Sequence, residues 1–177
     1  MKVAIIGTRE PTEDQLINAR TLASTLSVEG YTVATGAAYG VDHAAMQGAT
    51  GPGVLEVYLP WPSYNKELVP AHAKRIVYDD LKFPSWADSV QKYHPAPSRL
   101  TGAARKLMAR NYGIVEGCAL VIALPQKEGT GGTGQGIRIA RALGTPLIQQ
   151  AANVGLFDSS EEALVNLALD VLRRKAK

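Results

Sequence analysis

The sequence predicts an α/β protein, a single Rossmann-like domain in which helices cover both faces of a mostly parallel sheet, in three layers. The chain has 177 residues, a length typical of one domain. Short apolar runs alternate with longer amphipathic stretches, which is the pattern of strands joined by right-handed crossover helices. The run CALVIAL at residues 118–124 is apolar almost throughout, as expected of a central strand covered on both faces.

The expected strands are apolar runs that end at a glycine or at a polar or proline-containing turn. The first of them, KVAII, is followed directly by Gly7. A short additional strand is expected at residues 75–78. The main strands are expected at residues 2–6, 31–35, 54–59, 118–124 and 146–150.

The expected helices begin at capping residues and carry an apolar stripe. In the first, at residues 12–29, Thr12 can cap the amino end together with Gln15, three residues later, and Gly30 ends the helix. Ser98 is the expected N-cap of a long helix at residues 98–117. The other helices are expected at residues 41–49, 84–93, 133–143 and about 159–175.

Residues 60–97 form the least regular part of the chain. We expect them to be an insertion or lid on a single domain that spans residues 1–177, and not a second domain. The aromatic residues of this segment have two interpretations: a small satellite core, or a surface that stacks on a base. They are Trp61, Tyr64, Trp86 and Tyr93.

Composition limits the class of protein. Hydrophobic residues make up 46% of the chain and charged residues 20%, which are ordinary values for a folded globular protein. The formal net charge is +3 and much of the excess lies in the last few residues, so charge argues little for a nucleic-acid partner. No apolar run reaches the roughly 18 residues that span a membrane, and no leader pattern precedes the first strand. We therefore expect a cytoplasmic protein with no membrane partner.

Several kinds of site are not expected. The single cysteine, Cys118, cannot form an internal disulfide, and its place at the head of an apolar run predicts a buried thiol. The three histidines lack the spacing of metal ligands, so no metal site is expected. No Ser/His/Asp or Cys/His arrangement indicates a nucleophile, and catalytic residues remain unassigned.

Two turns follow the first two strands, at the edge of the sheet where such folds bind ligands. In the second turn, Gly36 marks a position that a side chain would obstruct. Asp42 lies in the first turn of the next helix, where it either compensates the helix dipole or contacts a polar ligand. The candidate ligand-binding residues of these turns are Gly7, Thr8, Arg9, Gly36, Ala37, Tyr39 and Asp42.

A third turn, GTGGTGQG at residues 129–136, opens a helix after the strand at 118–124. Glycines let the backbone approach a ligand, and the free amides and dipole of a helix start attract an anion such as phosphate. The alternative is a flexible linker. The turn is neither a P-loop nor a dinucleotide fingerprint, because no Lys-Ser/Thr pair closes it and it does not follow the first strand. Its candidate residues are Gly131, Gly132, Thr133 and Gln135.

The helix at 98–117 carries a polar pair, Arg110 and Asn111, at its apolar stripe. Polar groups on a buried face must be satisfied, so they either form a structural network or face the ligand pocket with the guanidinium on a phosphate. The expected stripe consists of Leu100, Ala104, Leu107 and Ile114.

These motifs resemble a known family. Residues 3–46, with a strand, a GTR turn, a helix and TGAAYGVD, resemble the opening of the DNA-processing protein A family. Residues 109–148, with the Arg-Asn pair, an apolar strand and the glycine-threonine turn, are similar to the second half of the same superfamily, called SLOG. The middle, 60–97, is similar to short members from phage genomes.

The resemblance implies a Rossmann-like fold and a nucleotide or single-stranded DNA ligand. SLOG phosphoribohydrolases carry a catalytic glutamate in their glycine turn, but Gly136 stands at that position here. A nucleotide N-glycosidase would therefore need another acid, such as Glu116 or Asp42. The leading hypothesis is a binding protein for a nucleotide or nucleotide derivative, with no required cofactor and with a homodimer as the expected assembly. The alternatives are a single-stranded DNA binder and a chain with a vestigial pocket that acts through partners.

Overall fold

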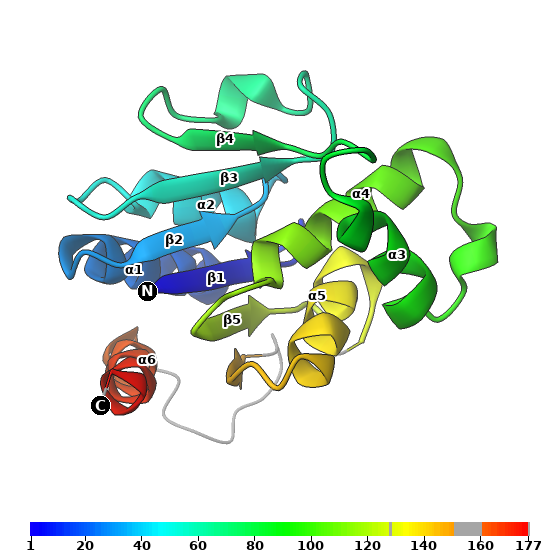
Figure 1. Cartoon of the computed structure of the whole chain (residues 1–177). Helices are drawn as coiled ribbons and strands as arrows, with labels where there is room; N and C mark the ends of the chain where they lie inside the picture. Colours follow the sequence, from blue (N-terminus) through cyan, green and yellow to red (C-terminus); the bar gives the residue numbers. More distant parts are fainter. Residues whose placement is uncertain (128, 151–160, 177) are drawn as a thin grey trace.

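The fold is a six-stranded parallel sheet between two layers of helices (Figure 1). The computed structural model describes residues 1–127, 129–150 and 161–176. Within these residues the strand order is β4-β3-β2-β1-β5-β6, and every neighbouring pair is parallel. The α/β class and the parallel sheet predicted from the sequence are confirmed. The strands are β1 (Lys2–Gly7), β2 (Thr32–Thr35), β3 (Leu55–Leu59), β4 (Lys74–Val77), β5 (Leu120–Leu124) and β6 (Leu147–Gln149).

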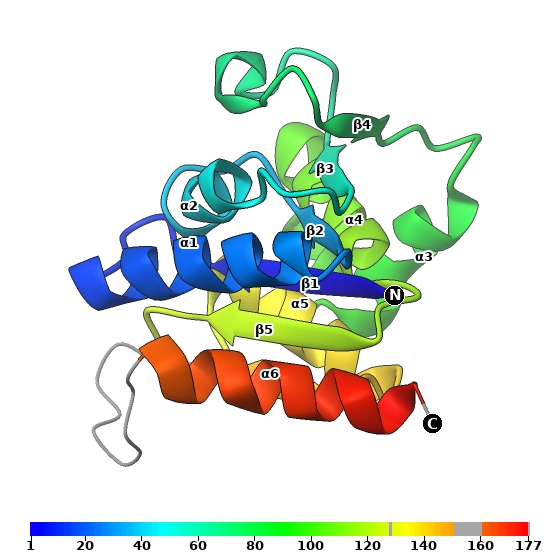
Figure 2. The ribbon, with the colours of Figure 1, turned by 90° about the vertical axis from the view of Figure 1, so that its left-hand side faces the viewer.

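In the part of the chain that the structure describes, three helices cover each face of the sheet (Figure 2). On one face lie α1 (Glu13–Val28), α2 (Val41–Gly48) and α6 (Glu161–Lys175). On the other lie α3 (Pro84–Tyr93), α4 (Gly102–Val115) and α5 (Gly131–Ala142). Two short 3₁₀ turns, Lys66–Leu68 and Pro97–Arg99, lie in the connections. The expected start of the last helix at residue 159 lies outside the described residues.

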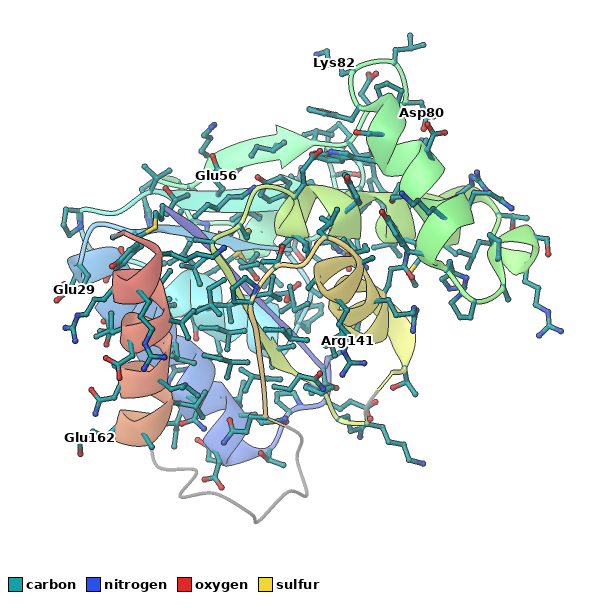
Figure 3. The ribbon with its side chains drawn as sticks, turned by 60° about the horizontal axis from the view of Figure 1, so that its bottom comes forward. Glu29, Glu56, Asp80, Lys82, Arg141 and Glu162 are labelled. Carbon is teal, nitrogen blue, oxygen red and sulfur yellow. The ribbon has the colours of Figure 1, made fainter. Side chains whose placement is uncertain are left out.

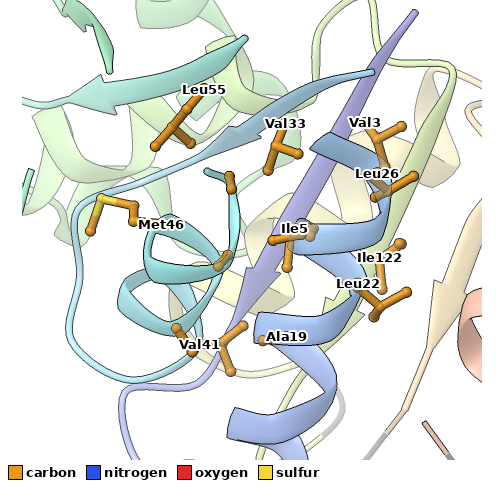
Figure 4. Packing of buried hydrophobic residues seen from close by; sticks show 14 of the residues in the cluster. Val3, Ile5, Ala19, Leu22, Leu26, Val33, Val41, Met46, Leu55 and Ile122 are labelled. Atoms are coloured by element: carbon orange, nitrogen blue, oxygen red, sulfur yellow. The ribbon is translucent and has the colours of Figure 1, made fainter. Parts of the chain in front are cut away.

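The alternation of side chains along β1 divides the core into two clusters. Val3 and Ile5 pack under α1, against Leu22 and Leu26 (Figure 4). Ala4 and its neighbours on the opposite face belong to the cluster under α4 and α5. Exposed charged side chains such as Glu29, Lys82 and Glu162 surround this core (Figure 3). No helix in the described part of the chain is long and apolar enough to cross a membrane.

The two predicted helix caps had different outcomes. Thr12 forms the expected capping box: its hydroxyl accepts from the Gln15 amide at 3.3 Å, and the Gln15 side chain accepts from the Thr12 amide at 3.2 Å. The prediction that Ser98 caps a helix at 98–117 is wrong. Pro97 begins a 3₁₀ turn and Leu100 is extended (φ −92°, ψ 125°), so α4 begins only after Thr101.

The predicted apolar stripe of this helix is only partly buried. Ile114 is buried in the core, but Ala104 is exposed and Leu107 is half-buried. The reason is that the first half of α4 extends past the carboxyl ends of the strands (Figure 1), so that only its second half packs on the sheet.

Residues 60–97 are more regular than the sequence suggested. They contain β4, which is the edge strand of the main sheet, and α3, which packs on α4. Trp86 of α3 is buried, and its ring stacks on Phe83 with centroids 4.1 Å apart, as the satellite-core interpretation expected. That the segment acts as a lid remains a prediction.

Candidate functional site

The candidate site lies where the direction of the strand order reverses. The chain builds β2, β3 and β4 on one side of β1 and then crosses to place β5 on the other side. Parallel α/β sheets bind ligands at this point, outside the carboxyl ends of the strands. A cavity of about 500 Å³ opens there, between Gly7 at the end of β1 and Pro125 after β5.

Most of the residues singled out in the sequence line this one cavity. The structure brings together the turn after β1, the first turn of α5 and the polar pair of α4. The predicted residues that line the cavity are Gly7, Thr8, Arg9, Asp42, Arg110, Asn111, Gly131, Gly132 and Thr133. The predicted residues that do not line it are Gly36, Ala37, Tyr39 and Gln135.

The wall formed by α5 presents backbone to the cavity. Gly129 and Gly131 have φ values of +78° and +57°, and a Cβ at either would meet nothing within 4 Å. Thr130, the N-cap residue, makes no side-chain capping bond. The amides of a first helical turn have no partner inside the helix, and the dipole places positive potential at the same end. This wall is therefore suited to an anion.

Arg138, which no motif in the sequence marked as a site residue, holds the glycine turn in place. Its guanidinium donates to the carbonyls of Tyr93 and Gly129 and to the Gln135 side chain, each at 3.0 Å. Gln135 is fully buried and accepts from Arg138, which explains why it does not reach the cavity. The spacing of three residues on one helix was the only sequence signal for this pair.

Arg110 faces the cavity from a buried position. It is 4% exposed, its Nη1 donates to the Tyr58 carbonyl at 3.1 Å, and its Nε has no hydrogen-bond partner. Its guanidinium lies 5.8 Å from the centre of the Tyr64 ring. Burial lowers the pKa of Arg110, although the nearby Asp42 carboxylate opposes this shift.

Asp42 is the buried acid beside Arg110. It accepts from the Ala38 amide at 3.3 Å, and burial raises its pKa while Arg110 acts to lower it. A Cβ at Gly36 would overlap Nη1 of Arg110 and lie 2.5 Å from an Asp42 carboxylate oxygen. A side chain at Gly36 would therefore displace the protein's own Asp42–Arg110 pair before it met a ligand.

Asn111 joins α4 to the glycine turn. Its amide nitrogen donates to the Gly132 carbonyl at 3.2 Å and lies 3.9 Å from the Met108 sulfur. The cavity side of α4 continues outward from Asn111 through Met108, Leu107 and Ala104. Met108 was missed in the sequence, and the other two were expected to be covered by protein.

The cavity entrance carries charges of both signs. Arg9 and Lys127 are exposed cations, and Arg9 donates to the Tyr64 hydroxyl at 3.4 Å. Glu10, also at the entrance, accepts from Gln126 at 3.4 Å, so the loops after β1 and β5 touch across it. The two cations leave the entrance with a small positive excess.

Of the two acids that an N-glycosidase could use, Asp42 lines the cavity but is buried beside Arg110 and accepts from the Ala38 amide. Glu116 does not line the cavity, and its carboxylate accepts from the Trp86 indole at 3.2 Å. A Cβ at Gly136 would lie 2.4 Å from the tip of the Ile6 side chain, so a glutamate at this position would require Ile6 to move. Within residues 1–127, 129–150 and 161–176, no group of three or more His, Cys, Asp or Glu residues could hold a metal ion.

Comparison with known proteins supports the family resemblance. Residues 1–60 match the family model of DNA recombination-mediator protein A. No curated protein gives a significant match to the sequence. The fold is similar to that of DNA processing protein A from Helicobacter pylori, whose structure was described for its single-stranded DNA binding mode. The TM-score is 0.67 and the identity 21%, and the match covers 96% of this chain and 80% of that one.

Two molybdenum cofactor proteins are also similar. The molybdenum cofactor binding protein of Rippkaea orientalis gives a TM-score of 0.58 and 23% identity over 96% of this chain and 85% of that one. The molybdenum cofactor carrier protein of Chlamydomonas reinhardtii gives a TM-score of 0.63 and 16% identity, and the match covers 97% of this chain and 98% of that one.

These matches confirm the resemblance inferred from the sequence. Residues 109–148 lie outside the range of the family model, and there the likeness is one of fold. The chain therefore resembles the DNA recombination-mediator protein A family in the sequence of residues 1–60, and it has the Rossmann-like fold of DNA processing protein A over nearly its whole length.

Proposed function

We propose that this protein binds a nucleotide or nucleotide derivative, with the phosphate on the glycine turn at the start of α5. The observation that carries the proposal is the cavity at the β1–β5 switch point. It joins the open amides of Gly131 and Gly132 to the unpartnered Nε side of the buried Arg110. An anion here meets backbone donors, a helix dipole and cationic side chains together.

The size of the cavity supports a small ligand. Its volume of about 500 Å³ lies within the range of about 300–1,000 Å³ that is usual for small-molecule pockets. Most of its lining is fixed by helices and strand ends, so the pocket exists before the ligand arrives. Similar solved proteins are named for binding single-stranded DNA or a molybdenum cofactor, which favours binding over catalysis. The absence of a carboxylate at Gly136 points the same way.

Single-stranded DNA is the second candidate. It is favoured by exposed basic residues near the start of α4, namely Arg99, Arg105 and Lys106, which lie outside the cavity. A strand lying over them would neutralise several phosphates, whereas one nucleotide in the cavity would not reach that far. The two ligands therefore differ in the number of counterions that they release.

Titrations at low and high salt separate the two candidates. We expect nucleoside monophosphates to bind with an affinity that changes little with salt. We expect oligo-dT to bind weakly. The logarithm of its binding constant should fall with the logarithm of the salt concentration, with a slope near −0.7 for each phosphate contacted. Tight oligo-dT binding with a slope of several units, and no binding of mononucleotides, would make the DNA interpretation the correct one.

A matched pair of glycine variants locates the site. Gly131 and Gly144 both have positive φ (+57° and +65°) and open space where a Cβ would lie, but only Gly131 lines the cavity. Gly131→Ala and Gly144→Ala should therefore strain the backbone equally, by about 1–2 kcal/mol. Only Gly131→Ala should weaken nucleotide binding. Equal affinities of the two variants would place the phosphate elsewhere.

A further inference from the structure

The first half of α4 carries an apolar surface that the described protein does not cover. Ala104, Leu107, Met108 and Asn111 follow the i, i+3, i+4, i+7 spacing of one helix face, and all four line the cavity. This spacing is typical of a face packed against a core. The second half of α4 is packed in that way: a Cβ at Gly113 would overlap the Trp86 ring. The first half has the same pattern and no such partner, since Ala104 is exposed and Leu107 and Met108 are half-buried.

The apolar face adjoins the anion-binding turn directly. Asn111 is the last residue of the face and donates to the Gly132 carbonyl at 3.2 Å. The cavity thus has a polar, positively polarised side at Gly131 to Thr133 and an apolar side on α4, with Asn111 between them. A ligand that satisfies both sides must be polar and anionic at one end and apolar at the other.

We propose that the face formed by Ala104, Leu107 and Met108 is the subsite for the ligand's flat ring, and that Asn111 determines which ring is accepted. The proposal rests on the function proposed above, because the phosphate end defines where the ring must lie. A ring lying on α4 removes the Leu107 and Met108 side chains from water, and the flexible Met108 thioether adapts to a flat surface.

Asn111 supplies the polar recognition. One of its amide N–H groups is used by Gly132, and the other has only the Met108 sulfur, a weak acceptor 3.9 Å from the nitrogen. The Asn111 carbonyl oxygen is free of partners in the described part of the chain, and the second N–H can exchange its weak contact for a ligand atom, so the two form an adjacent acceptor and donor. This pair fits a ring edge that carries an acceptor next to a donor, as nucleobases do. The ligand class is therefore a phosphorylated molecule with a heteroaromatic ring, and not a sugar phosphate or inorganic phosphate.

Calorimetric titration with ribose 5-phosphate and with the four common nucleoside 5′-monophosphates tests this. In the wild-type protein, the best nucleotide should bind at least roughly ten-fold more tightly than ribose 5-phosphate, because burying a ring on apolar side chains adds affinity. The double variant Leu107→Ser/Met108→Ser should lose that advantage. Leu81→Ser is the matched control, since Leu81 is 94% exposed and lies outside this cavity. It should leave the advantage intact.

Asn111→Leu tests recognition of the ring edge. It keeps the size of the side chain, removes both polar atoms and should reduce the preference among the four nucleotides by roughly ten-fold. The readout is the ratio of nucleotide affinities, because loss of the Gly132 bond affects every phosphorylated ligand alike. An unchanged ratio would overturn the role of Asn111.

The outcomes separate this inference from the proposed function. Equal affinity of ribose 5-phosphate and the nucleotides overturns the ring subsite and leaves phosphate binding standing. No binding of any of these probes overturns the proposed function itself. If the double variant instead changes the elution volume of the protein in size-exclusion chromatography, with nucleotide binding intact, a second copy covers the α4 face and the ring subsite is overturned.

Discussion

The two glycine-rich turns of this protein look similar in sequence and differ in what surrounds their glycines. At residues 36–42 the space is filled by the protein: a Cβ at Gly36 would overlap Arg110, and one at Gly40 would overlap the Thr8 carbonyl. At residues 129–132 the space is more open: a Cβ at Gly129 or Gly131 would meet nothing within 4 Å, and one at Gly132 would meet only the Asn111 amide nitrogen, at 3.3 Å. We call the first the closed turn and the second the open turn.

The difference shows that glycine is required for two physical reasons, which cannot be distinguished from the sequence alone. In the closed turn, Gly36 lets the buried Arg110 and Asp42 side chains approach the backbone, so the requirement there is one of packing, while Gly40 of the same turn also has a positive φ of +79°. In the open turn, glycine supplies a positive φ and leaves the amides accessible, so the requirement is one of conformation and ligand access. Substitutions in the closed turn should therefore affect stability, and substitutions in the open turn should affect binding.

The largest effect is expected for Gly36→Ala in the closed turn. The added methyl group overlaps the Arg110 guanidinium, which must leave its bond to Tyr58 and its place beside Asp42. Overpacking together with the loss of a buried charge pair should lower the free energy of unfolding by about 4 kcal/mol or more. Urea denaturation followed by circular dichroism measures this, with Gly131→Ala as the open-turn control. Equal stability of the two variants would contradict the comparison.

Arg110→Ala should have the next largest effect. It leaves the buried Asp42 without its cation, and we expect a loss of about 3 kcal/mol in stability. The effect should be smaller than that of Gly36→Ala because the cavity lets water reach the vacated space. The double variant Arg110→Ala/Asp42→Asn should recover part of the loss in thermal unfolding. If Arg110→Ala instead melts like the wild type and loses only nucleotide affinity, Arg110 contacts the ligand but does not stabilise the closed turn.

Arg138→Ala should affect the open turn without unfolding the protein. Arg138 holds the Gly129 carbonyl and ties the turn to Gln135 and to the end of α3. Its loss should weaken nucleotide binding by about ten-fold and cost about 1–2 kcal/mol in stability, as for hydrogen bonds from a charged group. Arg138→Lys keeps the positive charge and loses the forked arrangement of donors. It should bind nucleotide nearly as weakly as Arg138→Ala if Arg138 acts by fixing the turn, and as tightly as the wild type if only its charge matters. Arg174→Ala, in the exposed last turn of α6, is the control.

Local rules accounted for most of the fold. The apolar runs predicted the strands to within one or two residues, and Thr12 with Gln15 predicted the start of α1 because a capping box is a contact between near neighbours. The Ser98 cap failed because Pro97 and Leu100 favour a 3₁₀ turn and an extended residue, which delay the helix. The edge strand β4 was found, but the sequence did not show that it belongs to the main sheet.

The site was less predictable, because burial depends on contacts between distant residues. The sequence placed Arg110 and Asn111 together at the site, and both line the cavity. It did not show that Arg110 also donates inward to the Tyr58 carbonyl, 52 residues away, or that Asn111 donates to the Gly132 carbonyl. Periodicity marked Ala104 and Leu107 as covered, but it does not say whether protein or ligand covers them. Arg138 donates to the Tyr93 carbonyl, 45 residues earlier in the chain, and no local sequence pattern predicts a contact over that separation.

The smallest expected effect is a pH dependence confined to the closed turn. Burial raises the pKa of Asp42 above the value of about 3.9 that it has in an unfolded chain. Its contribution to stability is therefore fully present below about pH 4 and is lost as the pH rises through the folded-state pKa, by about 1.4 kcal/mol for each unit that separates the two values. Asp42→Asn cannot ionise, so the free energy of unfolding of this variant should improve relative to the wild type as the pH rises through that range. The difference in free energy of unfolding between Gly131→Ala and the wild type should stay constant over the same range, because the open turn contains no ionisable side chain.

The measurement is urea denaturation of the wild type, Asp42→Asn and Gly131→Ala at a series of pH values. If Asp42→Asn instead falls further behind the wild type as the pH rises, the attraction of Arg110 outweighs the burial of Asp42, and the closed turn is held by an ion pair more than by packing.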